Sequence, residues 1–163
     1  MKRLRNAAVL IGLLGPLPPA AAAETAAPAP LWHTSCAKDG TGRTACTVEQ
    51  FAVAMPQNVV AAHIRLSAAG QPDQMLMRLT VPLGVRLAPG VALSIDDAKP
   101  IELPFERCLA DGCQASAVLD KTALATFTRG KTLIVRYAMP EATAPLNIPI
   151  RLQGLADALQ TKK

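Results

Sequence analysis

The chain has 163 residues, 17 of them Lys or Arg and 12 Asp or Glu, which gives a formal net charge of +5 at neutral pH. Beyond the first few positions its basic residues are scattered, whereas a nucleic-acid-binding surface needs a clustered basic face, often with stacking aromatic side chains. We therefore expect no nucleic-acid partner. Aromatic residues make up only 3% of the chain, so the core is expected to be largely aliphatic.

Residues 1–23 have the features of a cleaved signal peptide. Three basic residues lie within the first five positions, residues 7–17 are largely apolar, and a run of alanines precedes Glu24. The apolar stretch is shorter than the roughly 20 residues of a membrane-spanning helix, and later apolar runs are interrupted by proline, glycine or charge. We expect no transmembrane segment and an exported bacterial protein of the periplasm. The same leader also serves proteins that associate with the outer membrane or are secreted.

Cleavage before Glu24 leaves 140 residues, with 14 basic and 12 acidic side chains. This length is enough for one domain with a single core. Residues 24–30 (ETAAPAP) are expected to form a short extended tail rich in proline and alanine. Residues 31–163 are expected to form the single domain.

Apolar and polar residues alternate through most of this domain, which predicts β-strands. The segments LWHTSC and TACTVEQF flank one turn, and residues 59–67 and 74–81 flank a second turn as a hairpin. The first strand of that hairpin has a predicted apolar face made of Val60, Ala62, Ile64 and Leu66. Further strands are expected at residues 91–95, 101–107, 132–137 and 146–152.

Prolines and two helical segments complete the predicted fold. Pro82, Pro104 and Pro149 cannot donate to a strand ladder, which indicates edge strands or breaks at these positions. Residues 120–129 begin with a capping aspartate, carry apolar side chains three positions apart and precede a glycine, which is typical of a short helix. Residues 154–160 predict a second short helix. The elements together predict a mainly β fold, an antiparallel β-sandwich with one or two short helices.

Four cysteines allow three disulfide pairings. Cys36 and Cys46 flank the turn KDGTGR, and Cys108 and Cys113 bracket Leu-Ala-Asp-Gly, in which Asp-Gly suits a tight turn. Because exported proteins fold in an oxidising compartment, we favour the local pairs Cys36–Cys46 and Cys108–Cys113. The alternative is a zinc site, but such sites usually have two short Cys-x2–4-Cys pairs and only one pair approaches that spacing. The Cys-x-x-Cys motif of thiol oxidoreductases is absent.

The sequence has no recognisable catalytic motif, such as Gly-x-Ser-x-Gly, His-Glu-x-x-His or a P-loop. The two histidines, His33 and His63, are interpreted as solvated surface residues, and Asp96-Asp97 as part of a turn. We therefore expect no catalytic residues, no enzymatic activity and no cofactor.

A periplasmic copper carrier is the alternative hypothesis. Met75 and Met77 point to one side of a predicted strand, and thioethers with a histidine such as His63 are suitable ligands for Cu(I). Met55 is a further candidate ligand. The two strand methionines share their face with other apolar side chains, which favours a place in the core.

An ordered series of short motifs resembles the invasion-associated locus B family of exported bacterial proteins. The motifs are Trp32-x3-Cys36, Cys46-x3-Gln50, Pro82-Leu83-Gly84-Val85, Pro89-Gly90-Val91, Ile95-Asp96-Asp97, Leu103-Pro104-Phe105-x-Arg107-Cys108-x4-Cys113, Gly130-Lys131 and Ile148-Pro149-Ile150. The resemblance implies an immunoglobulin-like β-sandwich, a periplasmic or surface location and no established enzymatic activity. It supplies no catalytic residues. The founding member of the family is associated with invasion of red blood cells by a pathogen.

The leading functional hypothesis is an envelope protein that binds a partner, either an envelope protein or a host-surface protein. The binding surface would be a set of sandwich loops or an edge strand that accepts an extended segment of the partner. The Pro-rich segment 81–90 and the loop 138–145 are the candidate surfaces. The copper carrier and a hydrolase without recognisable motifs are the competing hypotheses.

Overall fold

The alternating segments of the sequence form a mainly β domain in the computed structural model, which describes residues 30–38 and 40–160. The expected signal peptide at residues 1–23 and all but the last residue of the tail at residues 24–30 lie outside the described residues. The elements are, in chain order, β1 (His33–Lys38), β2 (Thr44–Ala54), β3 (Val59–Ala68), β4 (Met75–Val81), β5 (Val91–Ile95), β6 (Ile101–Leu103), β7 (Arg107–Leu109), β8 (Gly112–Leu119), α1 (Lys121–Arg129), β9 (Thr132–Tyr137), β10 (Leu146–Arg151) and α2 (Leu155–Gln160).

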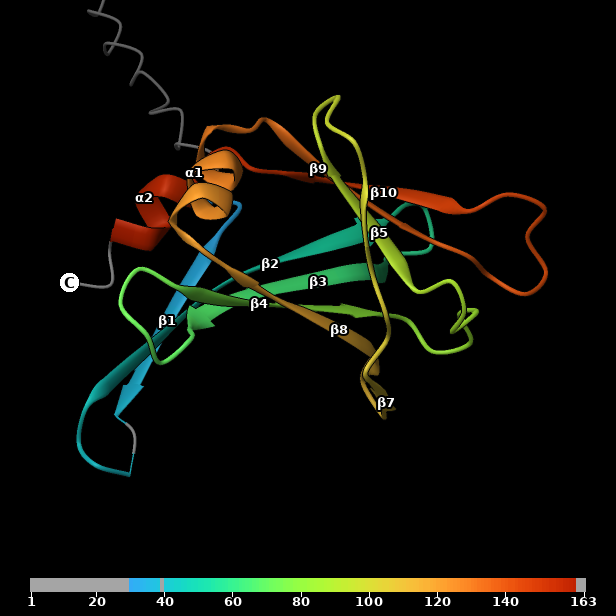
Figure 1. Cartoon of the computed structure of the whole chain (residues 1–163). Helices are drawn as coiled ribbons and strands as arrows, with labels where there is room; N and C mark the ends of the chain where they lie inside the picture. The colour runs from blue at the N-terminus through green and yellow to red at the C-terminus, as the bar shows by residue number, and fades with distance from the viewer. Residues whose placement is uncertain (1–29, 39, 161–163) are drawn as a thin grey trace, which may run out of the picture.

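The strands form two antiparallel sheets, one above the other in Figure 1. The larger sheet has the order β1-β2-β3-β4-β8-β7, and the smaller sheet has the order β10-β9-β5-β6. Strands β1 to β4 form a meander in which each strand pairs with the next along the chain, so both predicted hairpins are present. The expected β-sandwich with two short helices is confirmed.

The core lies between the inner faces of the two sheets and is largely aliphatic, as the small number of aromatic residues predicted. Strands β2, β3 and β4 supply one side of it, and β5, β9 and β10 supply the other. Its largest fully buried side chains in the strands are Val48, Ile64, Leu66, Met77, Leu79, Val81, Val91, Leu133, Val135 and Ile150. Burial of each such side chain stabilises a fold by about 1.5–3 kcal/mol, so this layer holds the two sheets together.

The segment predicted as one strand at residues 101–107 is two strands in different sheets. β6 pairs with β5 in the smaller sheet, whereas β7 pairs with β8 in the larger sheet. Pro104, which has no N–H to donate to a ladder, lies between them where the chain crosses from one sheet to the other. The prediction of one strand at residues 101–107 is wrong, because the segment is divided between the two sheets. The break at Pro104 and the edge position of Pro149 in β10 are confirmed.

Strand β8 was not among the predicted strands, although it pairs with β4 along the whole length of β4. Its inward side chains include Cys113, Ala115 and Ala117, all of which pack in or against the core. These side chains are small, so the contrast between its two faces is weak in the sequence.

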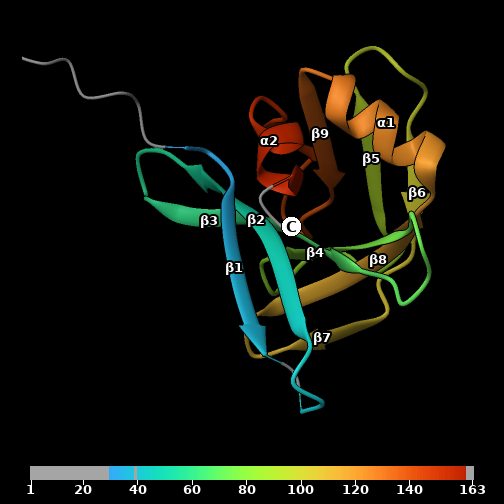
Figure 2. The same cartoon turned by 90° about the vertical axis from the view of Figure 1, so that its left-hand side faces the viewer.

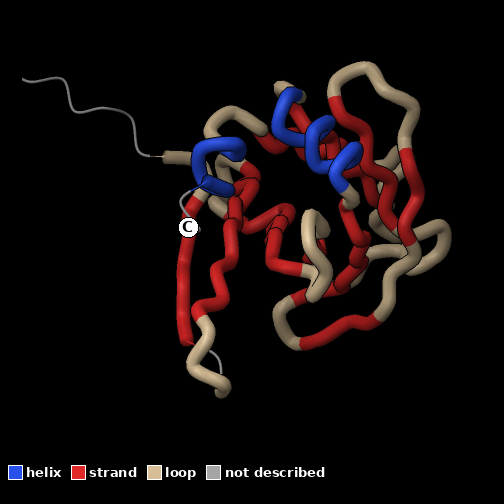
Figure 3. The backbone as a smooth tube through the Cα atoms, turned by 60° about the vertical axis from the view of Figure 1, so that its left-hand side comes forward, coloured by secondary structure: helices blue, strands red, loops and turns tan. Residues whose placement is uncertain are grey.

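Both helices lie at the same end of the sandwich (Figure 3). The Asp120 side chain accepts a 2.7 Å hydrogen bond from the Ala123 N–H and caps the start of α1, and Gly130 follows its end. Helix α2 is tied to β1, because the Thr34 hydroxyl donates to the Ala158 carbonyl at 3.2 Å. The two predicted helices are therefore confirmed, and α2 covers the beginning of the edge strand β1.

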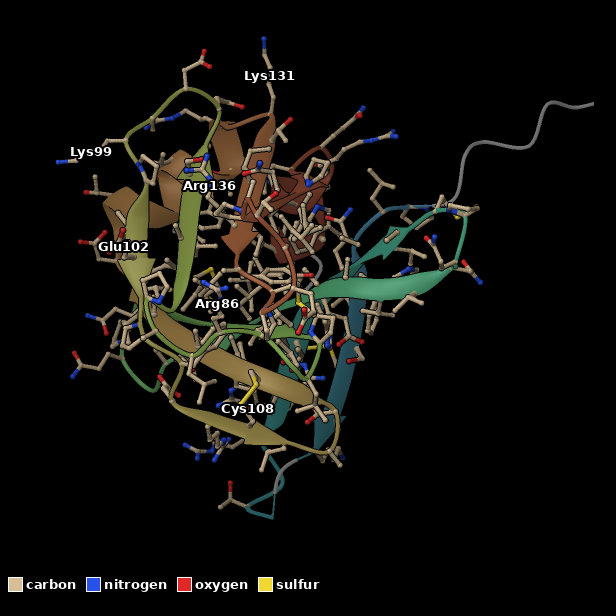
Figure 4. All side chains as sticks on the ribbon, turned by 90° about the vertical axis from the view of Figure 1, so that its right-hand side faces the viewer. Arg86, Lys99, Glu102, Cys108, Lys131 and Arg136 are labelled. Carbon is tan, nitrogen blue, oxygen red and sulfur yellow. A yellow bond between two sulfur atoms is a disulfide. The ribbon has the colours of Figure 1, made fainter. Side chains whose placement is uncertain are left out.

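Each cysteine pair bridges two neighbouring strands. Cys36 lies opposite Cys46 in β1 and β2, which run side by side in Figure 2, and the two form a disulfide. Cys108 lies opposite Cys113 in β7 and β8, and their disulfide is visible in Figure 4. The structure thus has the local pairing. No cysteine among the described residues is free, so none is available for the zinc site considered above.

The turn between β7 and β8 requires a glycine. Gly112 has a φ of 140°, which side-chain-bearing residues rarely adopt, and a Cβ at this position would clash with the Val81 carbonyl oxygen. The turn therefore lies directly against the end of β4. This close approach explains the Asp-Gly sequence before the second cysteine of the Cys108–Cys113 disulfide.

Asp96 and Asp97 lie in the predicted turn after β5, and Asp96 has an additional structural role. Its carboxylate accepts hydrogen bonds from the Thr132 N–H at 2.9 Å and the Lys131 N–H at 3.1 Å. Its own N–H donates to the Thr132 carbonyl at 2.8 Å. Asp96 has a φ of 50°, a conformation that aspartate tolerates better than most residues. One side chain therefore joins the ends of β5 and β9.

Replacing both cysteines of either disulfide with alanine is expected to lower the free energy of unfolding. The chain-entropy contribution is about 2.7 kcal/mol for a cross-link between residues 10 apart and about 2.1 kcal/mol for residues 5 apart. Urea denaturation of the oxidised wild type and the two double variants measures this loss. Reduced wild-type protein is the control and should be less stable than either double variant. An unchanged urea midpoint in a double variant would contradict the prediction.

Candidate interaction surface

The β2–β3 hairpin contains a β-bulge that turns an apolar side chain outward. Ala52 pairs with Ala62 and Val53 pairs with Val60, so Ala61 is an extra residue of β3 with no partner in β2. One extra residue moves all following side chains to the opposite face of a sheet. Val60 therefore lies beside Val53 on the outer face and is 44% exposed. The prediction that it shares the inner apolar face is wrong.

The bulge is held from the opposite sheet by Tyr137. The Tyr137 hydroxyl donates a buried 2.9 Å hydrogen bond to the carbonyl of Ala61. A buried carbonyl without a partner costs about 1–3 kcal/mol, so this bond stabilises the bulged conformation. Burial also raises the pKa of Tyr137 above its ordinary value of 10, and the hydroxyl therefore remains a donor at every physiological pH. The outward position of Val60 depends on a residue of β9.

Five exposed apolar side chains cover this hairpin, and we call them the hairpin patch. They are Phe51, Val53, Met55, Val59 and Val60, all of them at least 44% exposed. Phe51, Val53 and Val60 share the outer face of the sheet, whereas Val59 pairs with Ala54 and points to the other face of the projecting hairpin. The end of the hairpin projects beyond the rest of the sandwich (Figure 2). Single exposed apolar residues are ordinary on protein surfaces, but a contiguous group of them is typical of an interaction site.

His63 supports the aromatic residue of the hairpin patch. Its ring stacks on Phe51 with centroids 3.9 Å apart and planes inclined by 13°. Its Nε2 lies 3.0 Å from a carboxylate oxygen of Glu49, which also accepts from Nε of Arg65 at 3.3 Å. Burial lowers the pKa of His63 below its ordinary value of 6.5, and the hydrogen bond with Glu49 opposes part of this shift.

His63 therefore differs from its predicted role as a solvated surface residue. It lies on the outer face of β3, as the alternation indicated, but its side chain is only 13% exposed. The lowered pKa leaves the ring mostly neutral near pH 7. A neutral ring loses less solvation free energy than an imidazolium when a partner covers it. His33, by contrast, is exposed at the start of β1.

A cleft of about 210 Å³ lies beside the stacked rings. Its lining comes from the hairpin, from the end of β4 and from the turn between β7 and β8, and consists of Phe51, Val60, His63, Thr80, Val81, Pro82 and Asp111. The hairpin patch thus continues into the beginning of the candidate segment 81–90. The cleft has mainly apolar walls and is suited to an apolar side chain of a binding partner.

The two surface segments predicted from the sequence, residues 81–90 and 138–145, are neighbours in the structure. The Arg86 N–H donates to the Ala138 carbonyl at 2.8 Å, and the Arg86 guanidinium donates to the Pro140 carbonyl at 2.9 Å. A second cleft of about 250 Å³ lies between these segments and the outer face of the smaller sheet. Arg86 and Arg136 both lie on the side of the molecule that Figure 4 shows. Sequence reasoning identified both segments but did not reveal that they adjoin.

The proposed copper ligands do not come together. Met77 is fully buried in the core, and Met75 packs against the core from the same face of β4. His63 pairs with Thr80 on the outer face of the same sheet, so the sheet separates its ring from both thioethers. The interpretation of the methionines as core residues is confirmed, and the copper site built from Met75, Met77 and His63 is wrong.

The described residues contain neither a metal-binding cluster nor a membrane-spanning helix. No group of three or more His, Cys, Asp or Glu side chains in residues 30–38 and 40–160 is arranged to hold a metal ion. In the same part of the chain, neither helix has the length and apolar character needed to cross a membrane.

A family model described as invasion associated locus B (IalB) protein matches residues 32–163. This chain belongs to the IalB family. It is 32% identical over 130 residues to an invasion protein B homolog of Brucella abortus, an alignment that covers 78% of this chain and 73% of the relative. It is 23% identical over 133 residues to invasion protein B of Bartonella bacilliformis, with 80% and 70% of the two chains covered.

A solved member of the IalB family has the same fold. The crystal structure of invasion associated protein B from Bartonella henselae superimposes with a TM-score of 0.72 at 27% identity, over 82% of this chain and 90% of that chain. Residues of the motifs that suggested the family have structural roles in this chain. Trp32 is buried in the core, Pro104 lies at the crossing between sheets, and Asp96 joins β5 to β9.

Replacing Tyr137 with phenylalanine is expected to lower the free energy of unfolding by about 1–3 kcal/mol, because the Ala61 carbonyl loses its buried partner. Thr34→Val is the matched control, since it removes a hydroxyl that bonds a carbonyl in a partly buried place. Its expected cost is about 1 kcal/mol or less. Urea denaturation compares the two variants. A Tyr137→Phe loss no larger than that of Thr34→Val would contradict the role of the bulge contact.

The lowered pKa of His63 makes the stability depend on pH. Because the pKa is lower in the folded state, the unfolded chain binds more protons below about pH 6.5, and stability is lost as the pH falls through this region. His63→Gln should therefore lose less stability than the wild type between about pH 7.5 and pH 5. His33→Gln, at the exposed start of β1, is the control and should behave as the wild type. Parallel pH profiles for all three proteins would refute the prediction.

Proposed function

We propose that this chain is an exported, non-enzymatic protein of the bacterial envelope that binds a protein partner through the hairpin patch. The observation that carries the proposal is the projecting hairpin, whose five exposed apolar side chains adjoin a cleft of about 210 Å³. Phe51 stands in the patch on a rigid support formed by the His63 ring. Aromatic side chains in such positions often dominate the binding energy of protein interfaces.

The leader and the cysteine chemistry support export to the periplasm. Residues 1–23 have the composition of a signal peptide, whose removal would leave residues 24–30 as a tail and residues 31–163 as the domain. Both cysteine pairs are bonded, and disulfides persist in oxidising compartments such as the periplasm. From there the protein would reach an envelope partner directly, or a host cell after surface association or secretion.

The names of the relatives support a host-cell surface as one source of the partner. The Brucella homolog and the Bartonella protein are both called invasion proteins. A protein that contacts a host cell needs a binding surface but no catalytic centre, and the hairpin patch is such a surface. An envelope protein of the same bacterium is the other source.

The chemistry of the described residues supports a non-enzymatic role. All four cysteines are in disulfides, so they are not nucleophiles. Within residues 30–38 and 40–160, the side-chain hydrogen bond of His63 leads to Glu49 and not to a serine or threonine hydroxyl. His33 is exposed at the start of β1, opposite Glu49 of β2. A general base next to a nucleophile is the minimum arrangement for covalent hydrolysis.

The sheet edges are less suited to a partner than the hairpin patch. β10 contains Pro149, which cannot donate a ladder hydrogen bond, and β6 and β7 have three residues each. The beginning of β1 is covered by α2 through the Thr34 contact. Short, interrupted or covered edges resist strand addition. Side-chain contacts on the outer face of the larger sheet are therefore the favoured mode of binding.

Site-specific photocrosslinking in an exporting host tests the proposal. A photoreactive residue at Val53, in the hairpin patch, should give a discrete crosslinked product, and Phe51→Gln in the same chain should abolish it. The matched control places the photoreactive residue at Val118, which is 58% exposed in β8 outside the patch, and should give no such product. The same product from both positions, or none from Val53, would refute the patch as the binding site.

The intact mass of the exported chain is the accompanying control. The proposal requires a chain that begins at Glu24 and is four hydrogens lighter than the fully reduced form, because two disulfides have formed. A chain that retains residues 1–23, or that carries free thiols, would contradict export with both bonds formed. Only protein with this mass is suitable for the crosslinking comparison.

A further inference from the structure

An apolar cleft of about 200 Å³ opens between α1 and the inner face of the smaller sheet. Leu93, Ile95 and Leu133 form its sheet side, and Ala123 and Phe127 form its helix side. This cleft shares no residue with the hairpin patch or with the cleft beside it. An apolar cavity of about 150 Å³ is enough to bind benzene, so this space admits an alkyl segment of several carbons.

The sequence leaves this space open because two small side chains, Ala98 in the turn after β5 and Ala123 in α1, line the cleft where larger residues would fill it. The Thr126 hydroxyl, which also lines the cleft, already donates to the Thr122 carbonyl at 3.1 Å. The Thr126 hydroxyl therefore does not require a hydrogen-bond partner from a ligand.

The mouth of the cleft combines an exposed apolar side chain with a cation. Ile101 pairs with the inward-facing Leu93, lines the cleft and is 52% exposed. Lys99 also lines the cleft and extends outward from the turn between β5 and β6 (Figure 4). Within residues 30–38 and 40–160, Lys99 forms no ion pair. The Lys99 ammonium is thus available to an anionic group at the mouth.

We propose that this cleft binds a single-chain anionic amphiphile, such as a medium-chain fatty carboxylate. The alkyl chain lies between α1 and the smaller sheet, and the carboxylate lies at the mouth near the Lys99 ammonium. Charge complementarity selects an anion over a cationic or neutral amphiphile. The volume of the cleft selects one short chain over the paired chains of a phospholipid. The inference goes beyond the binding of a protein partner, because the two sites have no residue in common.

Titration of the oxidised protein with monomeric sodium octanoate, followed by amide chemical shifts in NMR, tests the proposal. The expected result is saturable shifts confined to α1, β5, β6 and the turn between the two strands. Ala123→Phe fills the cleft and should abolish the shifts. Thr122→Phe places the same side chain at an exposed neighbouring position of α1 and should leave them unchanged. Unchanged binding in Ala123→Phe would overturn the proposed site.

A surface variant tests the role of charge without affecting the core. Lys99→Met keeps the apolar stem and should weaken octanoate binding by up to about fivefold, the range expected of an exposed charge pair. The affinity for 1-octanol, the neutral analogue, should not change. Lys131→Met is the matched control at the same end of the domain. Equal affinities of wild type and Lys99→Met for octanoate would overturn the contact between lysine and carboxylate.

Vesicles of an anionic phospholipid provide the last arm of the experiment. The proposal expects no cosedimentation of the protein with vesicles at concentrations that saturate octanoate binding. Cosedimentation without any response to monomeric octanoate would show that the mouth of the cleft contacts a bilayer instead, and would overturn the proposal. A failure of octanoate binding leaves the crosslinking test of the hairpin patch unaffected.

Discussion

The two sheets must bury their apolar inner faces against each other, and the other features of the domain follow from this packing. The core is largely aliphatic, with Trp32, Phe127 and Tyr137 as its buried aromatic side chains. The chain crosses from the smaller to the larger sheet at Pro104, where no ladder hydrogen bond can form. Helix α1 then covers the open end of the sandwich and buries Phe127 against it.

The same packing constraint produces the two candidate binding sites. Tyr137 fits in the core only with a partner for its hydroxyl, and the Ala61 carbonyl of the bulge is that partner. The bulge in turn exposes Val60 and extends the hairpin patch. Ala123, by contrast with Tyr137, has a small side chain and leaves space between α1 and the smaller sheet. One site arises because a large side chain reaches across the core, and the other because a small one does not fill it.

Particular elements show how far sequence patterns predict this structure. The alternation at residues 74–81 and the capping aspartate before α1 each depend on local geometry, and both predictions are confirmed. Residues 101–107 were predicted as one strand, at an edge or broken at Pro104, because alternation alone does not show which sheet a residue joins. The bulge at Ala61 inverts the alternation at Val60, and no turn residue or glycine in β3 indicates its position. Strand β8 was not predicted, because its inward side chains are small and the contrast between its two faces is weak in the sequence.

The sequence by itself determined the family, the strand-rich class, the helix caps and the cysteines that are close enough along the chain to pair. Each of these depends on residues within about a dozen positions of one another or on an ordered series of motifs. Only the tertiary structure decided that Val60 turns outward at the bulge, that Arg86 joins two surface loops, and that Tyr137 contacts the bulge 76 residues away. These outcomes depend on which strands become neighbours, and that choice is made by the burial of the whole core and not by any local pattern.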